Sequence, residues 1–138
     1  MCANFRRTAR ALTQVYEKAL RPLGLRATQL TILQALSRAG EVSQGKLGGI
    51  LVMDTTSLTR TLAIMARRGW IEEQRGEDRR QRRIRLSAAG DTKLKRAMPV
   101  WEKMQSRLRG RLGKQKWGSL LQLTHYVTEI SRTQGGLL

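Results

Sequence analysis

The sequence predicts a mainly α-helical fold with one small β-hairpin, on three observations. Apolar residues recur at steps of three and four along most of the chain, which is the period of a helix with one buried face. Residues 70–90 instead alternate apolar and polar positions on both sides of a turn, as two paired strands do. The length of 138 residues suits one domain with its own hydrophobic core.

The first two helices are separated by helix-breaking residues. The first is expected over about residues 4–21, where the apolar stripe consists of Phe5, Ala9, Leu12, Tyr16 and Ala19 and continues to Leu23. Pro22 and Gly24 end this helix. Thr28 is expected to cap the second helix, which Gly40 ends and whose apolar residues are Leu30, Leu33 and Leu36.

A short third helix and a longer fourth helix follow. Ser43 can cap the third helix, whose apolar residues are Leu47, Ile50 and Leu51. Each glycine within it costs roughly 1 kcal/mol relative to alanine, so packing must hold together a helix that contains Gly45, Gly48 and Gly49. Asp54 is expected to cap the fourth helix, which ends at Gly69 and has an inward stripe of Leu58, Leu62 and Met65.

The predicted hairpin is rich in arginine. Ile71 on one arm and Ile84 and Leu86 on the other supply the buried face, and Gly76-Glu77-Asp78 form the turn. Six guanidinium groups lie around this turn, those of Arg75, Arg79, Arg80, Arg82, Arg83 and Arg85. So many like charges in one hairpin repel one another unless a polyanion is bound, and a nucleic-acid backbone is the simplest such partner.

Two helices complete the chain. After a connector at residues 87–90, a long helix starts near Asp91 and has the stripe Leu94, Met98, Trp101, Met104, Leu108 and Leu112. Pro99 removes a backbone hydrogen bond, so this helix should kink or restart there. Gly113 predicts a turn before the last helix, which is marked by Trp117, Leu120, Leu121, Val127 and Ile130.

The formal net charge is +17, from 27 Lys and Arg against 10 Asp and Glu. This balance favours nucleic acid or an anionic membrane as a partner, although it carries no information on fold. The longest apolar run is residues 50–53, far below the roughly 18 to 20 residues of a membrane span, and the N-terminus lacks a secretory apolar region. Cys2 is the single cysteine and cannot form an intramolecular disulfide, so we expect an intracellular, cytoplasmic protein.

The third and fourth helices have the spacing of a helix-turn-helix, with a short turn at residues 52–53. The second helix of this pair has an outward start of hydroxyl groups and an arginine, which can contact bases in the major groove: Thr55, Thr56, Ser57, Thr59 and Arg60. A hairpin directly after a recognition helix predicts a wing that lies along the backbone or enters the minor groove. Together with the positive charge, these features predict binding to duplex DNA.

Residues 78–90 follow the pattern D-x-R-x-x-x-x-x-L-[ST]-x-x-G, with Asp78, Arg80, Leu86, Ser87 and Gly90 at its fixed positions. This pattern is the signature of the MarR family of winged-helix transcription regulators, which the chain resembles. Residues 24–30 resemble the family's entry to the second helix, and residues 54–60 with Arg68-Gly69 resemble its recognition helix and exit. The resemblance extends over essentially the whole chain.

The resemblance implies a winged helix-turn-helix flanked by dimerisation helices, in a single MarR-like domain over residues 1–138. Residues 26–90 would form the DNA-binding lobe, and residues 1–23 and 91–138 the dimerisation helices. Broad apolar stripes that include Trp101, Trp117 and Leu121 agree with a homodimer, because one subunit alone cannot cover them. We therefore expect a regulator, a repressor, that binds a pseudo-palindromic operator with recognition helices roughly 34 to 36 Å apart.

Individual roles follow for the charged residues of the wing. Arg79, Arg80 or Arg82 is expected to enter the minor groove or to contact flanking phosphates. Asp78 either orients an arginine through a charge-assisted hydrogen bond or is only a turn residue. Further arginines are expected to contact the DNA backbone or to remain solvated: Arg83, together with Arg67, Arg68, Arg75 and Arg85.

The family commonly senses small aromatic acids or oxidants, which gives two further hypotheses. Cys2 precedes the first helix beside Arg6 and Arg7, whose charges favour the thiolate, so it is either a redox sensor or a bystander. A pocket for a small aromatic effector could be lined by Tyr16, Trp101 and Met104, which could equally be core residues. We expect no cofactor and no metal.

Three other classes of function are weaker. An enzyme needs a base, a nucleophile or a metal cluster, whereas the only histidine, His125, has just Glu129 one helical turn away. A non-specific nucleoid or architectural DNA-binding protein remains the alternative, and an RNA-binding protein would need exposed aromatic residues that the chain lacks. A membrane-surface protein would spread its basic residues along a helix face rather than gather them on a hairpin.

Overall fold

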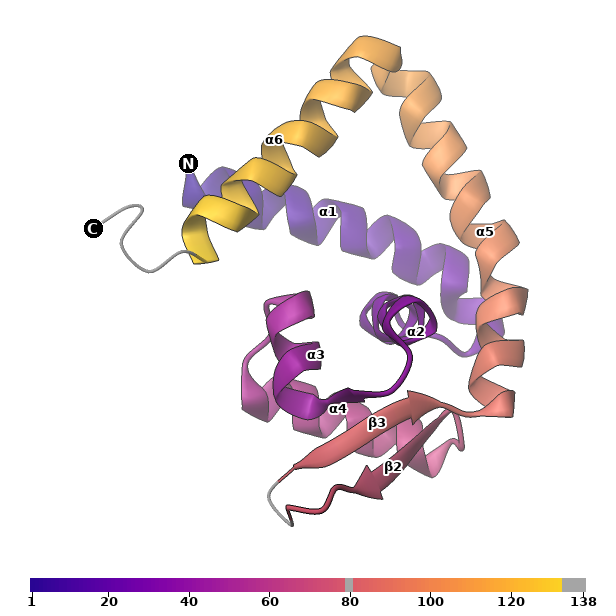
Figure 1. The fold of residues 1–138 in the computed structure, drawn as a ribbon. Coiled ribbons are helices and arrows are strands. Elements are labelled where there is room, and N and C mark those ends of the chain that lie inside the picture. The colour runs from indigo at the N-terminus through magenta and orange to yellow at the C-terminus, as the bar shows by residue number, and fades with distance from the viewer. Residues whose placement is uncertain (79–80, 133–138) are drawn as a thin grey trace. The chain divides into compact units, whose positions relative to one another are not determined.

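A computed structural model describes residues 1–78 and 81–132, and it confirms the predicted class, mainly helical with one small sheet (Figure 1). The chain divides into two compact units, Met1–Trp101 and Glu102–Leu138. In chain order the elements are α1 (Cys2–Leu20), the 3-10 helix η1 (Arg21–Leu23), α2 (Ala27–Ala39), β1 (Val42–Ser43), α3 (Gln44–Leu51), α4 (Thr55–Arg67), β2 (Ile71–Arg75), β3 (Arg82–Leu86), α5 (Ala88–Leu112) and α6 (Lys114–Arg132).

The junction between α1 and α2 shows one error in the sequence-based prediction. As expected, α1 ends before Pro22, and Gly24 adopts a left-handed conformation with φ of 63°. Thr28, however, is not the cap, because α2 already begins at Ala27. Its free N–H groups are bound instead by two other side chains, since Gln29 Oε1 accepts the N–H of Arg26 and Glu17 Oε1 accepts that of Ala27, each at 2.9 Å.

The predicted caps of α3 and α4 are confirmed. Ser43 Oγ accepts the backbone N–H of Lys46 at 3.2 Å, and Asp54 Oδ1 accepts that of Ser57 at 2.9 Å. Between the two helices, Val52 has a left-handed conformation with φ of 53°, and it is the one non-glycine residue with a positive φ in the described part of the chain. A β-branched residue is strained there, so contacts outside the turn must hold it.

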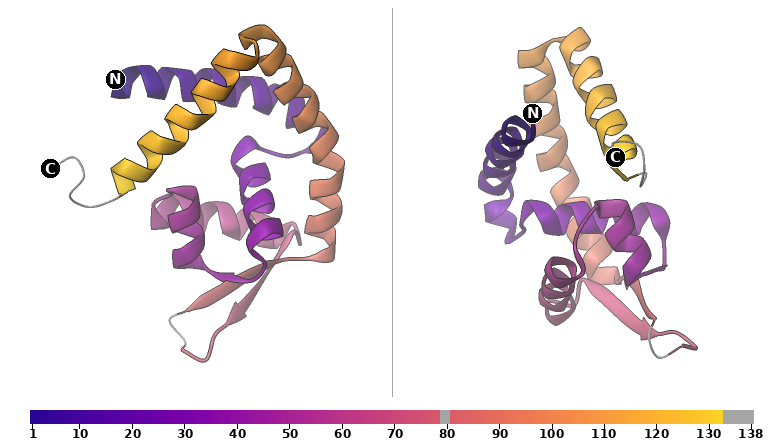
Figure 2. Two further views of the ribbon diagram at one scale, coloured as in Figure 1. Left: turned by 45° about the horizontal axis from the view of Figure 1, so that its top comes forward. Right: turned by 90° about the vertical axis from the view of Figure 1, so that its left-hand side faces the viewer.

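The sheet has three antiparallel strands in the order β1-β3-β2, one more than predicted. Strand β1 is only two residues long, and Val42 pairs with Ile84 of β3. The predicted hairpin is formed by β2 and β3, but its turn extends further than residues 76–78, because Gly76 N–H donates to the carbonyl of Gln81 at 2.9 Å. Both views in Figure 2 show this hairpin projecting beyond α3 and α4.

Helix α5 starts earlier than predicted, since residues 88–90 belong to it rather than to a connector. Ser87 is responsible, because its Oγ accepts the N–H of Gly90 at 3.0 Å and so caps the first turn. A Cβ atom at Gly90 would lie 1.9 Å from the carbonyl oxygen of Trp70, so only glycine fits here. Pro99 lies inside a helix that continues to Leu112, so the predicted restart does not occur.

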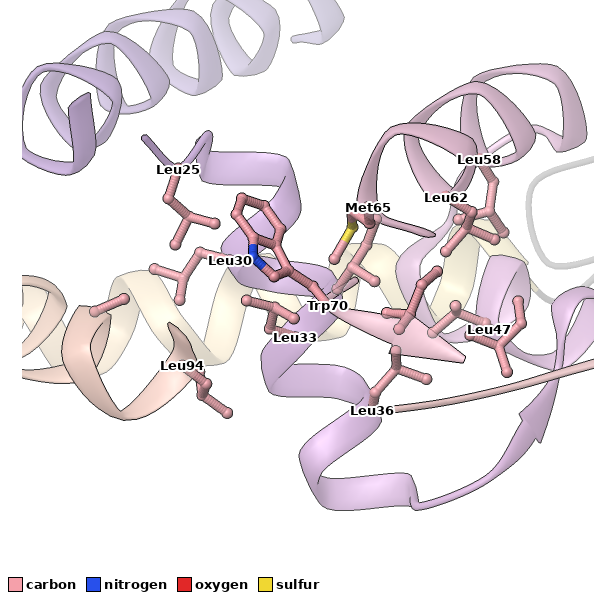
Figure 3. Close-up of a cluster of buried hydrophobic side chains, with 14 of the residues drawn as sticks. Leu25, Leu30, Leu33, Leu36, Leu47, Leu58, Leu62, Met65, Trp70 and Leu94 are labelled. Carbon is pink, nitrogen blue, oxygen red and sulfur yellow. The ribbon is translucent and has the colours of Figure 1, made fainter. Parts of the chain in front are cut away.

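The hydrophobic core belongs to the first unit and lies between the helices and the sheet (Figure 3). Leu58, Leu62 and Met65 are buried in it, as the stripe of the fourth helix predicted. Trp70 joins the same core, with the Arg68 guanidinium 5.1 Å and the Lys93 ammonium 5.0 Å from its ring centroid. Arg68 Nη1 also donates to the carbonyl of Gly24 at 2.8 Å, so it connects the end of α4 to the α1–α2 junction.

The second unit leaves its apolar residues exposed or only partly buried. None of the described residues 102–132 is buried. Helix α6 exposes four large apolar side chains, those of Leu120, Leu121, Leu123 and Tyr126. None of the described helices combines the length and the apolar character needed to cross a membrane. A helical unit without buried residues therefore needs a further surface to pack against.

Candidate nucleic-acid interface

The first turns of α4 present a polar surface to solvent. Its buried side carries Leu58, which is 1% exposed, whereas the predicted base-reading residues are all exposed: Thr55, Thr56, Ser57, Thr59 and Arg60. The Asp54 cap fixes this end of the helix. Hydrogen bonds from the backbone N–H and then from the side chain of Ser57 hold the pKa of Asp54 below its ordinary value, so the cap is a carboxylate at neutral pH.

A side-chain hydrogen bond joins the two helices of the helix-turn-helix. Gln44 Nε2, in the first turn of α3, donates to Thr59 Oγ1 at 2.7 Å. Sequence reasoning missed Gln44, because it lies outside the apolar stripe and nothing in the local pattern connects it to a residue of the next helix. The bond fixes the side chain of Thr59. The hydroxyl groups of Thr55, Thr56 and Ser57, at the start of the helix, take no part in it.

A cavity of about 760 Å³ lies where α3, α4 and the hairpin meet. We call it the interface cavity, and its lining residues are Ser43, Gln44, Gly45, Gly48, Gly49, Met53, Thr55, Leu58, Thr59, Gln81 and Arg82. Gly45 has no atom within 4 Å of the position of a Cβ, so the backbone of α3 is open to close approach from this side. Residues of the recognition helix and of the wing therefore face one concave surface.

The three described arginines of β3 differ in how far their charge is neutralised. Arg83 Nε lies 2.5 Å from Glu41 Oε1, and Arg85 Nη2 lies 2.6 Å from Glu72 Oε2. Arg82 forms a weaker pair, because its Nη1 lies 3.8 Å from Glu73 Oε2, and its side chain is 59% exposed. Arg82 is also paired in register with Arg75, an arrangement of like charges that an anion would stabilise.

Strand geometry accounts for this difference. Side chains alternate between the two faces of a strand, so Arg82 shares the face of buried Ile84, whereas Arg83 and Arg85 lie on the opposite face. At the Arg82 end of β3, this face borders the interface cavity, and Arg82 is one of the residues that line it. Of the arginines predicted to bind DNA, Arg82 is therefore brought together with the recognition helix, and Arg83 is paired with Glu41 instead.

Two of the arginines predicted to contact DNA, Arg79 and Arg80, lie outside the described residues, so their predicted minor-groove contacts stay predictions. Asp78 is exposed, and its carbonyl oxygen accepts the N–H of Gln81 at 2.9 Å, which is the geometry of a turn residue.

The candidate sensor residues lie on α1 and α5. Cys2 is exposed, and Arg6 Nη2 donates to its Sγ at 3.8 Å. Tyr16 and Trp101 pack against the core of the first unit, where burial raises the pKa of Tyr16. Met104 belongs to the second unit. The packing of Tyr16 and Trp101 supports the core role that the sequence left open, and the effector pocket stays a prediction.

A helix pair joined by a short turn, with a polar-faced second helix followed by a β-hairpin, defines a winged helix-turn-helix. The model of the MarR family matches residues 25–81. The chain is also 31% identical to the transcriptional regulator MosR of M. tuberculosis, in a crystal structure with DNA, with 97% of each chain covered and a TM-score of 0.87. The chain belongs to the MarR family.

Two other relatives agree with this assignment. YwoH of Bacillus subtilis, an uncharacterized HTH-type transcriptional regulator, is 27% identical over 86 residues, which are 62% of this chain and 63% of YwoH. The chain thus matches less than two thirds of the length of that relative. A mutant of MarR from E. coli with operator DNA is 21% identical over 91% of each chain, with a TM-score of 0.81, and supports the fold. MosR and YwoH are both described as transcriptional regulators.

Proposed function

We propose that the chain is a transcriptional regulator that binds duplex DNA sequence-specifically as a homodimer. The observation that carries this proposal is the interface cavity, in which Thr55 and Thr59 of the recognition helix face the same space as Arg82 of the wing. A net charge of +17 supplies the long-range attraction to a polyanion. The relation to MosR, whose structure contains DNA, supports a regulator over a non-specific architectural protein.

In this proposal α4 enters the major groove with its N-terminal end. Thr55, Thr56 and Ser57 offer small donors and acceptors to base edges, and Arg60 can bind guanine through two hydrogen bonds. Thr59 contributes mainly by its bond to Gln44, which holds α3 and α4 together. Arg82 contacts a phosphate or enters the minor groove, with Arg79 and Arg80 nearby in sequence. Arg83 contributes less, because Glu41 already neutralises it.

We propose that residues 1–23 and 91–138 form the dimer and that residues 26–90 form the DNA-binding lobe. The support is the uncovered apolar surface, since Phe5 and Val15 of α1 are exposed in addition to the four apolar residues of α6. A two-fold axis would repeat the recognition helix roughly 34 to 36 Å away, one turn of duplex, and would require a pseudo-palindromic operator. Binding at a promoter in this way favours repression.

We also propose that DNA is released on binding a small aromatic ligand or on oxidation. For oxidation, the support is the exposure of Cys2 and its contact with Arg6. Peroxide should then release DNA from the wild-type protein and not from Cys2→Ser. Release that persists in this variant would remove Cys2 from the proposal.

Selection of bound sequences from a random duplex pool tests the central proposal. The expected result is one enriched pseudo-palindrome with half-site centres about 10 base pairs apart, bound by two chains per duplex in light scattering. Tight binding without any enriched motif would support the architectural alternative. Failure to bind any duplex at low salt would overturn DNA binding altogether.

A further inference from the structure

A second cavity, of about 490 Å³, lies at the other end of the recognition helix. We call it the junction cavity, because it lies where η1, α2 and the C-terminal end of α4 meet. Its lining residues are Glu17, Arg21, Gly24, Leu25, Arg26, Gln29, Ile64 and Arg68, and none of them lines the interface cavity. Its volume is in the range of about 300 to 1,000 Å³ typical of small-molecule sites.

The charges that line the junction cavity are not balanced. Its lining includes three arginines, Arg21, Arg26 and Arg68, but a single acidic residue, Glu17. Glu17 uses its carboxylate to accept the backbone N–H of Ala27, and none of the three arginines forms an ion pair with any described residue. The cavity therefore has an excess of two positive charges without counter-ions.

Gln29 provides a second and independent indication. Its side chain is 6% exposed, and its Oε1 accepts the N–H of Arg26. Its amide nitrogen donates to no acceptor in the described part of the chain. No fully enclosed side-chain nitrogen or oxygen lacks a partner among the described residues, so this nitrogen is accessible from outside, and Gln29 lines the junction cavity. The amide nitrogen can therefore donate to an acceptor oxygen of a ligand.

We propose that the junction cavity is a binding site for a small polar anion with two or more acceptor oxygens, a carboxylate or a phosphate. Guanidinium groups bind such oxygens in planar pairs of hydrogen bonds, and the Gln29 amide adds a neutral donor. A free anion fits better than a DNA phosphate. Ile64 lies about 13 Å along α4 from Thr55, at the end of the helix that points away from the bases.

Arg68 connects this site to its surroundings. Its guanidinium donates to the carbonyl of Gly24 and also lies over the Trp70 ring at 5.1 Å. An anion that binds Arg68 therefore changes the electrostatic environment of Trp70. Tryptophan fluorescence reports on the site, independently of DNA.

The test is a calorimetric titration of the full-length protein with inorganic phosphate and, separately, with succinate, in chloride buffer without DNA. The variants are Arg26→Gln and Arg21→Gln, which each remove one charge from the cavity. The matched control is Arg38→Gln, an exposed arginine in the last turn of α2, the helix that Arg26 directly precedes, and outside the cavity. Thermal unfolding of each variant verifies that it is folded.

We expect saturable binding of one anion per chain, a change in tryptophan fluorescence, and a loss of affinity of roughly tenfold or more in Arg26→Gln and Arg21→Gln. Arg38→Gln should bind within about twofold of the wild type. Absence of saturation by either anion at about 10 mM would overturn the proposal. Equal weakening in Arg26→Gln and Arg38→Gln would do the same, because it indicates general attraction to a basic protein.

A DNA titration tests the other possible occupant of the junction cavity, a phosphate of the DNA backbone. If Arg26→Gln weakens duplex binding as strongly as Arg82→Ala while neither small anion binds, the junction cavity holds a backbone phosphate and the proposal is wrong. Since the anion titrations contain no DNA, failure of the proposed regulator function leaves their outcome unchanged.

Discussion

Replacing Arg82 by alanine should weaken DNA binding much more than replacing Arg85, although both lie on β3. Arg82 lines the interface cavity and is 3.8 Å from its nearest carboxylate, that of Glu73. Arg85 is bound to Glu72 at 2.6 Å, on the opposite face of the strand. Arg82 thus has charge available for DNA, whereas the charge of Arg85 is already largely neutralised.

The magnitude follows from the number of contacts. A homodimer has two wings, so Arg82→Ala removes two phosphate contacts and should reduce the slope of log K against log salt by about 1.8. Each contact is exposed and screened, and at about 1 kcal/mol each their loss lowers affinity by roughly 30-fold at low salt. Arg85→Ala should change the slope by less than half as much, about 0.9 or below.

Fluorescence anisotropy with the selected duplex, titrated at several salt concentrations between about 50 and 200 mM, measures both quantities. The two variants carry the same change in net charge, so a difference between them cannot come from overall attraction. Equal slopes for Arg82→Ala and Arg85→Ala would refute the argument from strand faces and ion pairs.

Three further predictions concern the fold and the dimer. Gly90→Ala should destabilise the protein by about 3 kcal/mol or more in urea unfolding, because its Cβ would meet the Trp70 carbonyl at 1.9 Å, and a smaller loss would show that α5 can shift. Asp54→Asn should keep the α4 cap but remove an acid-dependent part of stability. Because the pKa of Asp54 is lower in the folded than in the unfolded protein, its carboxylate stabilises the fold at neutral pH, and this stabilisation is lost as the pH falls below about 3.8. Identical acid unfolding curves for the wild type and Asp54→Asn would contradict this prediction. Leu123→Glu should yield monomers in light scattering, whereas Gln122→Glu, its exposed neighbour on α6, should remain a dimer. A dimeric Leu123→Glu would exclude this face from the interface.

The features that could be predicted from the sequence are those set by residues close together in the chain. Ser43 and Asp54 were recognisable as caps because a cap binds an N–H three residues later. The stripe of Leu58, Leu62 and Met65 was recognisable from the helical period. The same kind of signal could have separated Arg82 from Arg83, because strand alternation from Ile84 assigns them to opposite faces.

The features that were missed depend on residues distant in sequence. Strand β1 is too short for any periodicity and exists because Val42 pairs with Ile84. The N-cap of α2 is Arg26 rather than the predicted Thr28, because Glu17, on α1, accepts the free N–H of Ala27. The partner of Arg83 is Glu41, and the junction cavity draws its arginines from α1–α2 and from α4. Only folding brings these groups together.

The conformation of Val52 has a consequence for the geometry of the whole DNA-reading lobe. A valine in the left-handed region costs about 1 to 2 kcal/mol, so the linker by itself would relax to another shape and carry α4 to another angle. The angle is therefore imposed by the two helices on the linker, through the close approach of Gly48 to Leu58 and the bond from Gln44 to Thr59. A Cβ atom at Gly48 would lie 3.4 Å from a methyl group of Leu58 and 3.4 Å from the carbonyl oxygen of Met53, so alanine fits there in ordinary contact, whereas a larger side chain would push α4 away from α3 and change the angle of the recognition helix.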